Sequence, residues 1–229
     1  MVSPRPHEDV IEASAFKFLA QIQKSEGYDA TLDVLEAVAS VYGGWDLANF
    51  RRTFVEQRTL STRRARSLGA ELAAIISNLP VHHALILCRL AQPPLTQSAQ
   101  RKTGAYYTDF RLAQELARRF VEPLPPNPSV IDLACGTGVL LVATAIQLSN
   151  GKKSKMNRVL SRAIFGCDLS KDALRGARLA LAALTNNLET VRFLNQHLIH
   201  QDSLATDHEA WLRIAPKGFS AVIGNPPWE

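Results

Sequence analysis

The N-terminal part of the chain carries apolar side chains at the spacing of amphipathic helices. Residues 9–25 place apolar side chains on one helical face, and residues 31–42 form a second such pattern that stops at Gly43-Gly44. Three further helical patterns cover 46–58, 62–78 and 81–91. The pattern predicts a small all-helical module over residues 1–94, followed by a polar linker over 95–102.

Beyond the linker, short apolar runs alternate with helical patterns. An amphipathic helix is predicted over 109–121, and helices follow the first two apolar runs. The four runs, each expected to form a strand, are 130–133, 163–167, 191–194 and 219–224. Strands alternating with helices predict a doubly wound parallel α/β sheet over residues 103–229, whose ligands bind beyond the carboxyl ends of the strands.

A glycine turn follows the first predicted strand. Gly136 and Gly138 allow the backbone to approach a ligand closely, and the helix that follows offers free N–H groups to an anionic group. The dinucleotide fingerprint requires a third glycine where this chain has Leu141, which disfavours a nicotinamide or flavin site. A plain structural turn is the alternative.

Polar residues also end the second and fourth predicted strands. Asp168 lies where nucleoside-binding sheets use an acid to hold ribose hydroxyls, although it could equally cap the next helix. Its separation from Asp132 is lengthened by a lysine-rich insertion at 150–158. After the fourth strand, Asn225-Pro226-Pro227-Trp228 offers carbonyl acceptors and an aromatic face, which suits a planar NH₂ group held for reaction. A structural proline turn is the alternative there.

The composition is that of a globular protein, with 46% hydrophobic and 21% charged residues. No apolar run is long enough for a membrane span and no signal peptide is recognised, so we expect a cytoplasmic protein. The three cysteines have no CxxC spacing, which predicts neither disulfides nor a metal site.

Positive charge is concentrated in two segments of a chain whose net charge is +5. Residues 51–66 contain six arginines and one acid, and residues 151–162 contain five cations and no acid. Such clusters attract polyanions, although they also occur as solvated faces in proteins that bind no nucleic acid. We expect Arg63, Arg64 and Arg66 to contact DNA phosphates.

Five ordered segments together resemble the S-adenosylmethionine-dependent DNA adenine-N6 methyltransferases. They are Lys102-Thr103-Gly104-Ala105-Tyr106-Tyr107-Thr108, Asp132-Leu133-Ala134-Cys135-Gly136-Thr137-Gly138, Gly166-Cys167-Asp168, Gln201-Asp202-Ser203 and Asn225-Pro226-Pro227-Trp228. Their order is similar to the gamma arrangement of type I modification subunits and fused restriction-modification enzymes. The resemblance implies a Rossmann-like methyltransferase domain that transfers a methyl group to the exocyclic amine of a flipped adenine.

The resemblance also implies roles for individual residues. Tyr106, Tyr107 and Thr108 would line the methionine end of the cofactor, and the segment holding Asp132, Ala134, Cys135, Gly136 and Gly138 would pass beneath it. Asp168 would hold the ribose and Asp202 the adenine amino group of the cofactor. Asn225 and the Pro226 carbonyl would hold the target amine, next to Pro227, and Trp228 would stack on the base. No general base is implied.

The chain departs from the family pattern at three points. Asp109 stands where the family has proline, which predicts a looser loop, and Trp228 replaces Tyr or Phe while keeping a stacking face. The family has three more strands and a target-recognition domain after the position of Glu229. We therefore expect a fragment, or a second chain that completes the sheet, and little or no DNA methylation by this chain alone.

Two other functions remain open at the level of sequence. A protein glutamine-N5 methyltransferase faces the same problem of a delocalised nitrogen lone pair and has a similar Asn-Pro-Pro-aromatic motif. A catalytically silent partner would instead use the helical module to bind DNA or another subunit. Methylation of an RNA base is a weaker third option.

Overall fold

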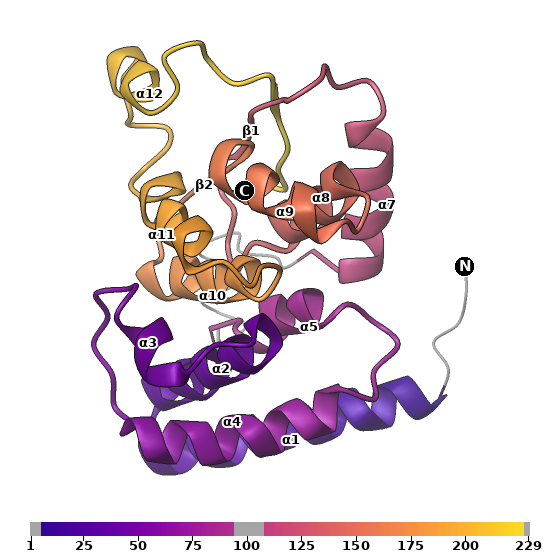
Figure 1. The fold of residues 1–229 in the computed structure, drawn as a ribbon, viewed down its shortest axis with the longest axis vertical. Helices are drawn as coiled ribbons and strands as arrows, with labels where there is room; N and C mark the ends of the chain where they lie inside the picture. The colour runs from indigo at the N-terminus through magenta and orange to yellow at the C-terminus, as the bar shows by residue number, and fades with distance from the viewer. Residues whose placement is uncertain (1–5, 94–107, 227–229) are drawn as a thin grey trace.

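The computed structural model describes residues 6–93 and 108–226. Its N-terminal part is helical, as predicted, and forms the lower half of the molecule in Figure 1. The helices are α1 (Pro6–Glu26), α2 (Tyr28–Gly43), α3 (Leu47–Arg51), α4 (Thr62–Ile76) and α5 (His83–Leu90). Helix α2 is central, because it packs against α1, α4, α5 and α10 and is buried along most of its length. It is capped by Gly44, whose φ of 71° lies in the left-handed region that favours glycine.

The helix expected over 46–58 is much shorter than the pattern suggested. Asp46 caps α3 by accepting the N–H of Asn49, but the helix ends at Arg51. The backbone N–H groups of Thr59 and Leu60 instead donate to the Asp33 carboxylate, each at 2.7 Å. That buried acceptor binds N–H groups that a continued helix would direct to its own carbonyls, so tertiary contacts determine the course of this segment.

The C-terminal part is a parallel α/β structure, which confirms the predicted fold class. Four strands form one sheet in the order β3-β2-β1-β4, with every neighbouring pair parallel. The elements are α7 (Phe110–Val121), β1 (Val130–Asp132), α8 (Val139–Ser149), α9 (Lys153–Arg162), β2 (Ile164–Asp168), α10 (Lys171–Ala182), α11 (Leu188–His197), β3 (Leu198–His200), α12 (His208–Ile214) and β4 (Ala221–Val222). The lysine-rich insertion is thus a helix, α9, added to the crossover between β1 and β2.

The third strand was predicted at the wrong place. Residues 191–194 lie within α11, and the strand follows directly after that helix as β3. Asn187 caps α11 by accepting the N–H groups of Glu189 and Thr190. Val191 and Leu194, three positions apart, are both fully buried. The short apolar run therefore belongs to an amphipathic helix, a pattern that four residues alone cannot distinguish from a strand.

The two parts of the chain pack on each other through α10. In Figure 1 this helix lies between the sheet and the N-terminal helices α2 and α5. Arg175 on α10 forms a buried ion pair with Asp33 on α2, with 2.6 Å between nitrogen and oxygen. The buried apolar side chains of both parts form one continuous cluster. Over the described residues, no helix combines the length and apolar character needed to span a bilayer.

Candidate functional site

The turn between β1 and α8 brings the chain to the carboxyl edge of the sheet. Gly136 and Gly138 have φ values of 52° and 83°, a conformation that costs glycine least. At Gly138 a Cβ atom would lie 2.9 Å from the Cβ of Ala177, so close packing against α10 also requires glycine. At Gly136 a Cβ atom would have no neighbour within 4 Å. This part of the turn is open to a ligand.

Asp168, at the end of β2, fastens that turn to the next strand. Its Oδ2 accepts the N–H of Gly136 at 2.7 Å, and its Oδ1 accepts the N–H of Ser170 at 2.8 Å. The side chain of Ser170, not that of Asp168, caps α10 by accepting the N–H of Ala173. Each carboxylate oxygen can accept more than one hydrogen bond, so Asp168 can hold the turn and a ligand hydroxyl at once.

Asp132 lies beneath the turn and is almost completely buried. Burial raises the pKa of its carboxyl to about 7, the hydrogen bond from the Ala134 N–H opposes that rise, and the nearby Asp168 charge adds to it. A Cβ atom on Gly224 would lie 3.3 Å from Asp132 Oδ1, so the carboxyl is also close to the chain that leaves β4. Asp132 therefore packs between the two segments that border the site.

The glycine turn and the end of β4 border one cleft, to which the start of α7 also contributes. Its lining residues are Thr108, Asp132, Ala134, Cys135, Gly136, Thr137, Val139, Leu140 and Asn225. Asn225 Nδ2 donates to Thr108 Oγ1 at 3.1 Å, across 117 positions of sequence. The structure thus brings together the glycine turn, the position after the Tyr-Tyr pair and the asparagine of the Asn-Pro-Pro-Trp segment.

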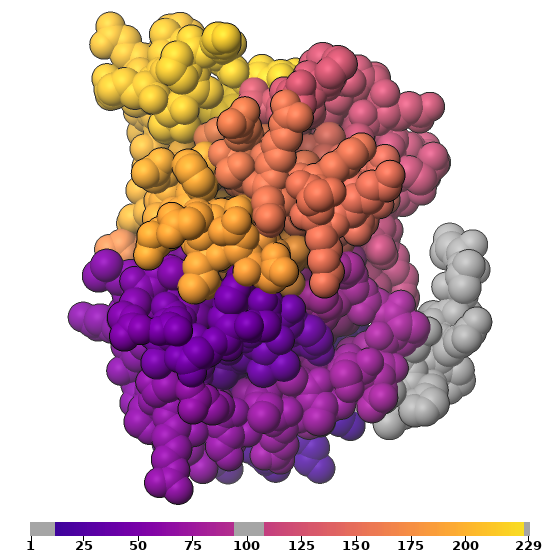
Figure 2. Space-filling view, in the orientation of Figure 1, coloured from indigo at the N-terminus to yellow at the C-terminus, as the bar shows by residue number. Residues whose placement is uncertain are grey.

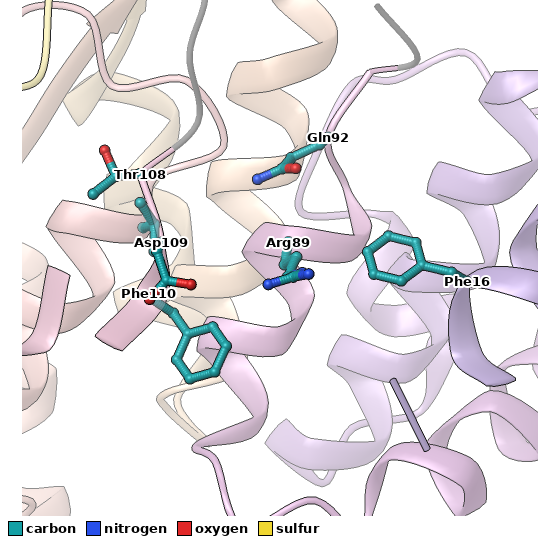
Figure 3. A pocket seen from close by; sticks show the side chains of 7 residues that line it. Phe16, Arg89, Gln92, Thr108, Asp109 and Phe110 are labelled. Atoms are coloured by element: carbon teal, nitrogen blue, oxygen red, sulfur yellow. The ribbon is translucent and has the colours of Figure 1, made fainter. Parts of the chain in front are cut away.

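A second cavity of about 250 Å³ adjoins this cleft and shares Thr108 and Val139 with it. In Figure 3, Phe16, Arg89 and Gln92 of the helical part face Thr108, Asp109 and Phe110 across this cavity. Sequence analysis missed these three residues of the helical part. No local signal could have found them, because no motif marks their segments and these reach the cavity only through tertiary packing.

Asp109 caps α7, and the loop that its departure from proline is expected to loosen lies outside the described residues. Its Oδ1 accepts the N–H groups of Arg111 and Leu112, at 2.8 and 3.4 Å. A proline cannot provide that side-chain acceptor, so aspartate fixes the start of α7 in a different way. Thr108 lies directly before this cap and lines the cleft.

Asp202 does not line the cleft, although it follows β3 at the same edge of the sheet. Its side chain is exposed, and Oδ1 accepts the N–H groups of Leu204 and Ala205 at the start of a turn. Its role toward a ligand stays a prediction. Tyr106, Tyr107, Pro227 and Trp228, as well as the linker over 95–102, lie outside the described residues.

Cys135 is buried inside the glycine turn, and burial raises the pKa of its thiol well above the usual value. A Cβ atom on Gly166 would lie 2.9 Å from its sulfur, so Cys135 fills the space that this glycine leaves in β2. A protonated, packed thiol is a poor nucleophile. The side chain contributes shape to the turn.

The arginines of residues 51–66 do not form the free positive cluster that the sequence suggested. Arg51 and Arg58 both pair with Glu36, which is buried. Arg64 and Arg66 are exposed but pair with Glu26 and Asp46. Contact of Arg63, Arg64 and Arg66 with DNA stays a prediction, and two of the six arginines are directed into the fold.

Comparison with known proteins gives the family. A sequence model of the N-6 DNA Methylase family matches residues 93–229. A protein from Listeria monocytogenes, assigned as a class I S-adenosylmethionine-dependent methyltransferase, has a TM-score of 0.47 and 16% identity over 96% of this chain and 59% of its own. A protein from Vibrio vulnificus YJ016, assigned as the modification subunit of a type I restriction enzyme, has a TM-score of 0.47 and 14% identity over 99% and 62%. The chain spans about six-tenths of the length of these two structures.

Proposed function

Because the chain belongs to the N-6 DNA methylase family, we propose that its cleft binds S-adenosylmethionine and directs methyl transfer to the N6 amine of an adenine in DNA. We further propose that this activity serves a restriction-modification enzyme, with duplex DNA as the substrate and other subunits as partners. The observation that carries the proposal is the placement of Asn225 beside the glycine turn, through its hydrogen bond to Thr108.

The residues of the cleft suit the proposed cofactor. Gly136 is open on the side where a Cβ would be, so a ligand can lie against its backbone. Asp168 retains acceptor capacity for ribose hydroxyls, and its charge beside the cleft favours a cation. When bound, S-adenosylmethionine supplies an electrophilic methyl group next to a sulfonium charge. Tyr106, Tyr107 and Thr108 would enclose its methionine end, and Asp202 would hold its adenine amine.

The target amine would be held at the other side of the cleft. The lone pair of an aromatic amine is delocalised, so the nitrogen becomes nucleophilic only when its geometry turns tetrahedral. The hydrogen bond to Thr108 uses the NH₂ group of Asn225, and the carbonyl oxygen of the same amide would accept from a substrate amine. Together with the Pro226 carbonyl it would grip the two amine hydrogens and favour the transition-state geometry, while Trp228 would stack on the extruded base.

Cofactor binding is expected to depend on Asp168. Replacing Asp168 with alanine removes the acceptor of the Gly136 N–H and of the proposed ribose contact, so the dissociation constant for S-adenosylmethionine should rise about 10- to 100-fold. Isothermal titration calorimetry of the purified protein measures it. Asp172→Ala is the matched control, because Asp172 is exposed on α10 and close in sequence. Equal affinities of both variants would contradict the proposed site.

The acceptor of the methyl group decides between the proposed function and its nearest rival. When the chain is supplied with the C-terminal strands and target-recognition domain of the family, tritium from labelled S-adenosylmethionine is expected in N6-methyladenine of duplex DNA. Asn225→Ala should lower that transfer at least 100-fold, in line with loss of a preorganised acceptor. Label in a glutamine side chain of a peptide instead would assign the protein to glutamine-N5 methylation. Cofactor binding without transfer to either substrate would indicate the catalytically silent partner.

A further inference from the structure

Helix α9 is an addition to the crossover between β1 and β2. A crossover between parallel strands needs one helix, and α8 already supplies it. Helix α9 follows α8 and packs against α8 and α11 through Met156, Val159 and Leu160, which are buried. The opposite side of α9 is exposed, and the segment lies on the near face of the molecule in Figures 1 and 2.

The exposed side of this segment is positively charged and is not neutralised. Its cations, all exposed, are Lys152, Lys153, Lys155, Arg158 and Arg162. Among the described residues none of these side chains takes part in an ion pair, and residues 151–162 include no acid. Other arginines of the chain are paired: Arg175 with Asp33, Arg178 with Glu56, and Arg192 with Glu189. The charge of α9 is therefore available to an external partner.

The geometry of these cations suits a phosphate backbone. Lys155, Arg158 and Arg162 recur at i, i+3 and i+7 and so form one stripe along the helix. The stripe spans about 10 Å, given the rise of an α-helix. The same length of duplex axis carries about six phosphate charges.

The chemistry of the surface distinguishes DNA from a protein partner. Protein interfaces have an apolar centre and are depleted in lysine, whereas DNA interfaces are polar and strongly positive. Every large apolar side chain of α9 is buried, and its exposed side chains are lysine, arginine and serine. These residues supply charge without an apolar anchor.

We propose that the exposed face of α9 binds the sugar-phosphate backbone of duplex DNA, without sequence preference, at a surface separate from the cleft. Helix α9 ends at Arg162, directly before the amino end of β2, whereas the cleft lies at the carboxyl ends of β1 and β2. The two surfaces thus lie at opposite edges of the sheet. A second contact of this kind raises the local concentration of DNA at the protein.

Salt dependence of DNA binding tests this surface. Fluorescence anisotropy with a labelled duplex, without S-adenosylmethionine, gives the slope of log affinity against log salt concentration. For the variant Lys155→Gln/Arg158→Gln the slope is expected to be smaller in magnitude by about 2, because each lost phosphate contact removes about 0.9. The matched control Lys17→Gln/Lys24→Gln removes the same charge from exposed positions on α1 and should keep the wild-type slope.

Three outcomes would overturn the proposal. The first is an equal salt slope for the two variants, and the second is no binding of the duplex by the wild-type protein in low salt. The third is that replacing Lys155 and Arg158 weakens binding of polyglutamate but leaves binding of the duplex unchanged. The test is independent of the proposed methyl transfer. A smaller salt slope without methyl transfer supports the α9 surface and contradicts the proposed methyl transfer. Methyl transfer with equal salt slopes supports the proposed function and contradicts the α9 surface.

Discussion

Replacing Asp33 with alanine is expected to lower the free energy of unfolding by about 3–5 kcal/mol, the usual cost of leaving a buried charge without its partner. The Asp33 carboxylate is fully buried and accepts three hydrogen bonds, from Arg175 at 2.6 Å and from the N–H groups of Thr59 and Leu60 at 2.7 Å. Its removal leaves the Arg175 guanidinium buried and uncompensated. Both parts of the fold should be affected, because the ion pair joins α2 to α10.

Chemical denaturation followed by circular dichroism measures this change. The control is Asp46→Ala, which removes an exposed ion pair with Arg66 and should cost at most about 1 kcal/mol beyond the loss of a helix cap. Adding Arg175→Met to the Asp33 variant should recover part of the loss, because the orphaned charge is then gone. A cost no greater for Asp33→Ala than for Asp46→Ala would show that the pair does not hold the two parts together.

Replacing Asp132 with asparagine is expected to stabilise the protein at pH 8 and to remove part of its pH dependence. The pKa of the carboxyl is raised from 3.8 to about 7, mainly by burial. The folded state therefore holds a proton that the unfolded state releases, so this contribution to stability is present below about pH 4 and is lost as the pH rises through about 7. The ionised carboxyl then costs on the order of 4 kcal/mol at pH 8.

Asparagine has the same shape and can accept the Ala134 N–H, but it carries no charge. The free energy of unfolding, measured by urea denaturation between pH 4.5 and 8, should differ between wild type and variant by an amount that grows with pH. The exposed Asp29→Asn substitution on α2 serves as the control and should leave the pH profile in place. Parallel profiles for wild type and Asp132→Asn would contradict the raised pKa.

Helix α10 connects the two parts of the molecule to the proposed cofactor site. Its body carries Arg175, which pairs with the helical part, and its start follows Asp168, which holds the glycine turn. Ala177 on the same helix lies against Gly138. The helical part thus supports the element on which the turn rests, and through Phe16 and Arg89 it also lines a cavity beside the cleft.

Much of the site was predictable from sequence because its signals are local. A glycine turn after a buried strand and an acid at the end of the next strand both require the carboxyl edge of a parallel sheet, and the structure has Gly136 and Asp168 hydrogen-bonded there. The contact of Asn225 with Thr108 was not predictable from spacing, because it depends on β4 pairing with β1. Asp202 follows β3 at the same edge, where its Oδ1 accepts N–H groups of a local turn, and its role toward a ligand stays a prediction.

The sequence by itself determined the alternation of strands and helices, the helical N-terminal part and the segments that carry the chemistry, because hydrophobic periodicity and turn residues act over a few positions. Only the tertiary structure decided that residues 191–194 are helical, that Arg51 and Arg58 are used inside the fold, and that α9 keeps its charge exposed. Each of these outcomes depends on partners distant in sequence, such as Glu36 for the two arginines. Local patterns do not encode which distant groups meet, so burial and pairing resolve what periodicity leaves open.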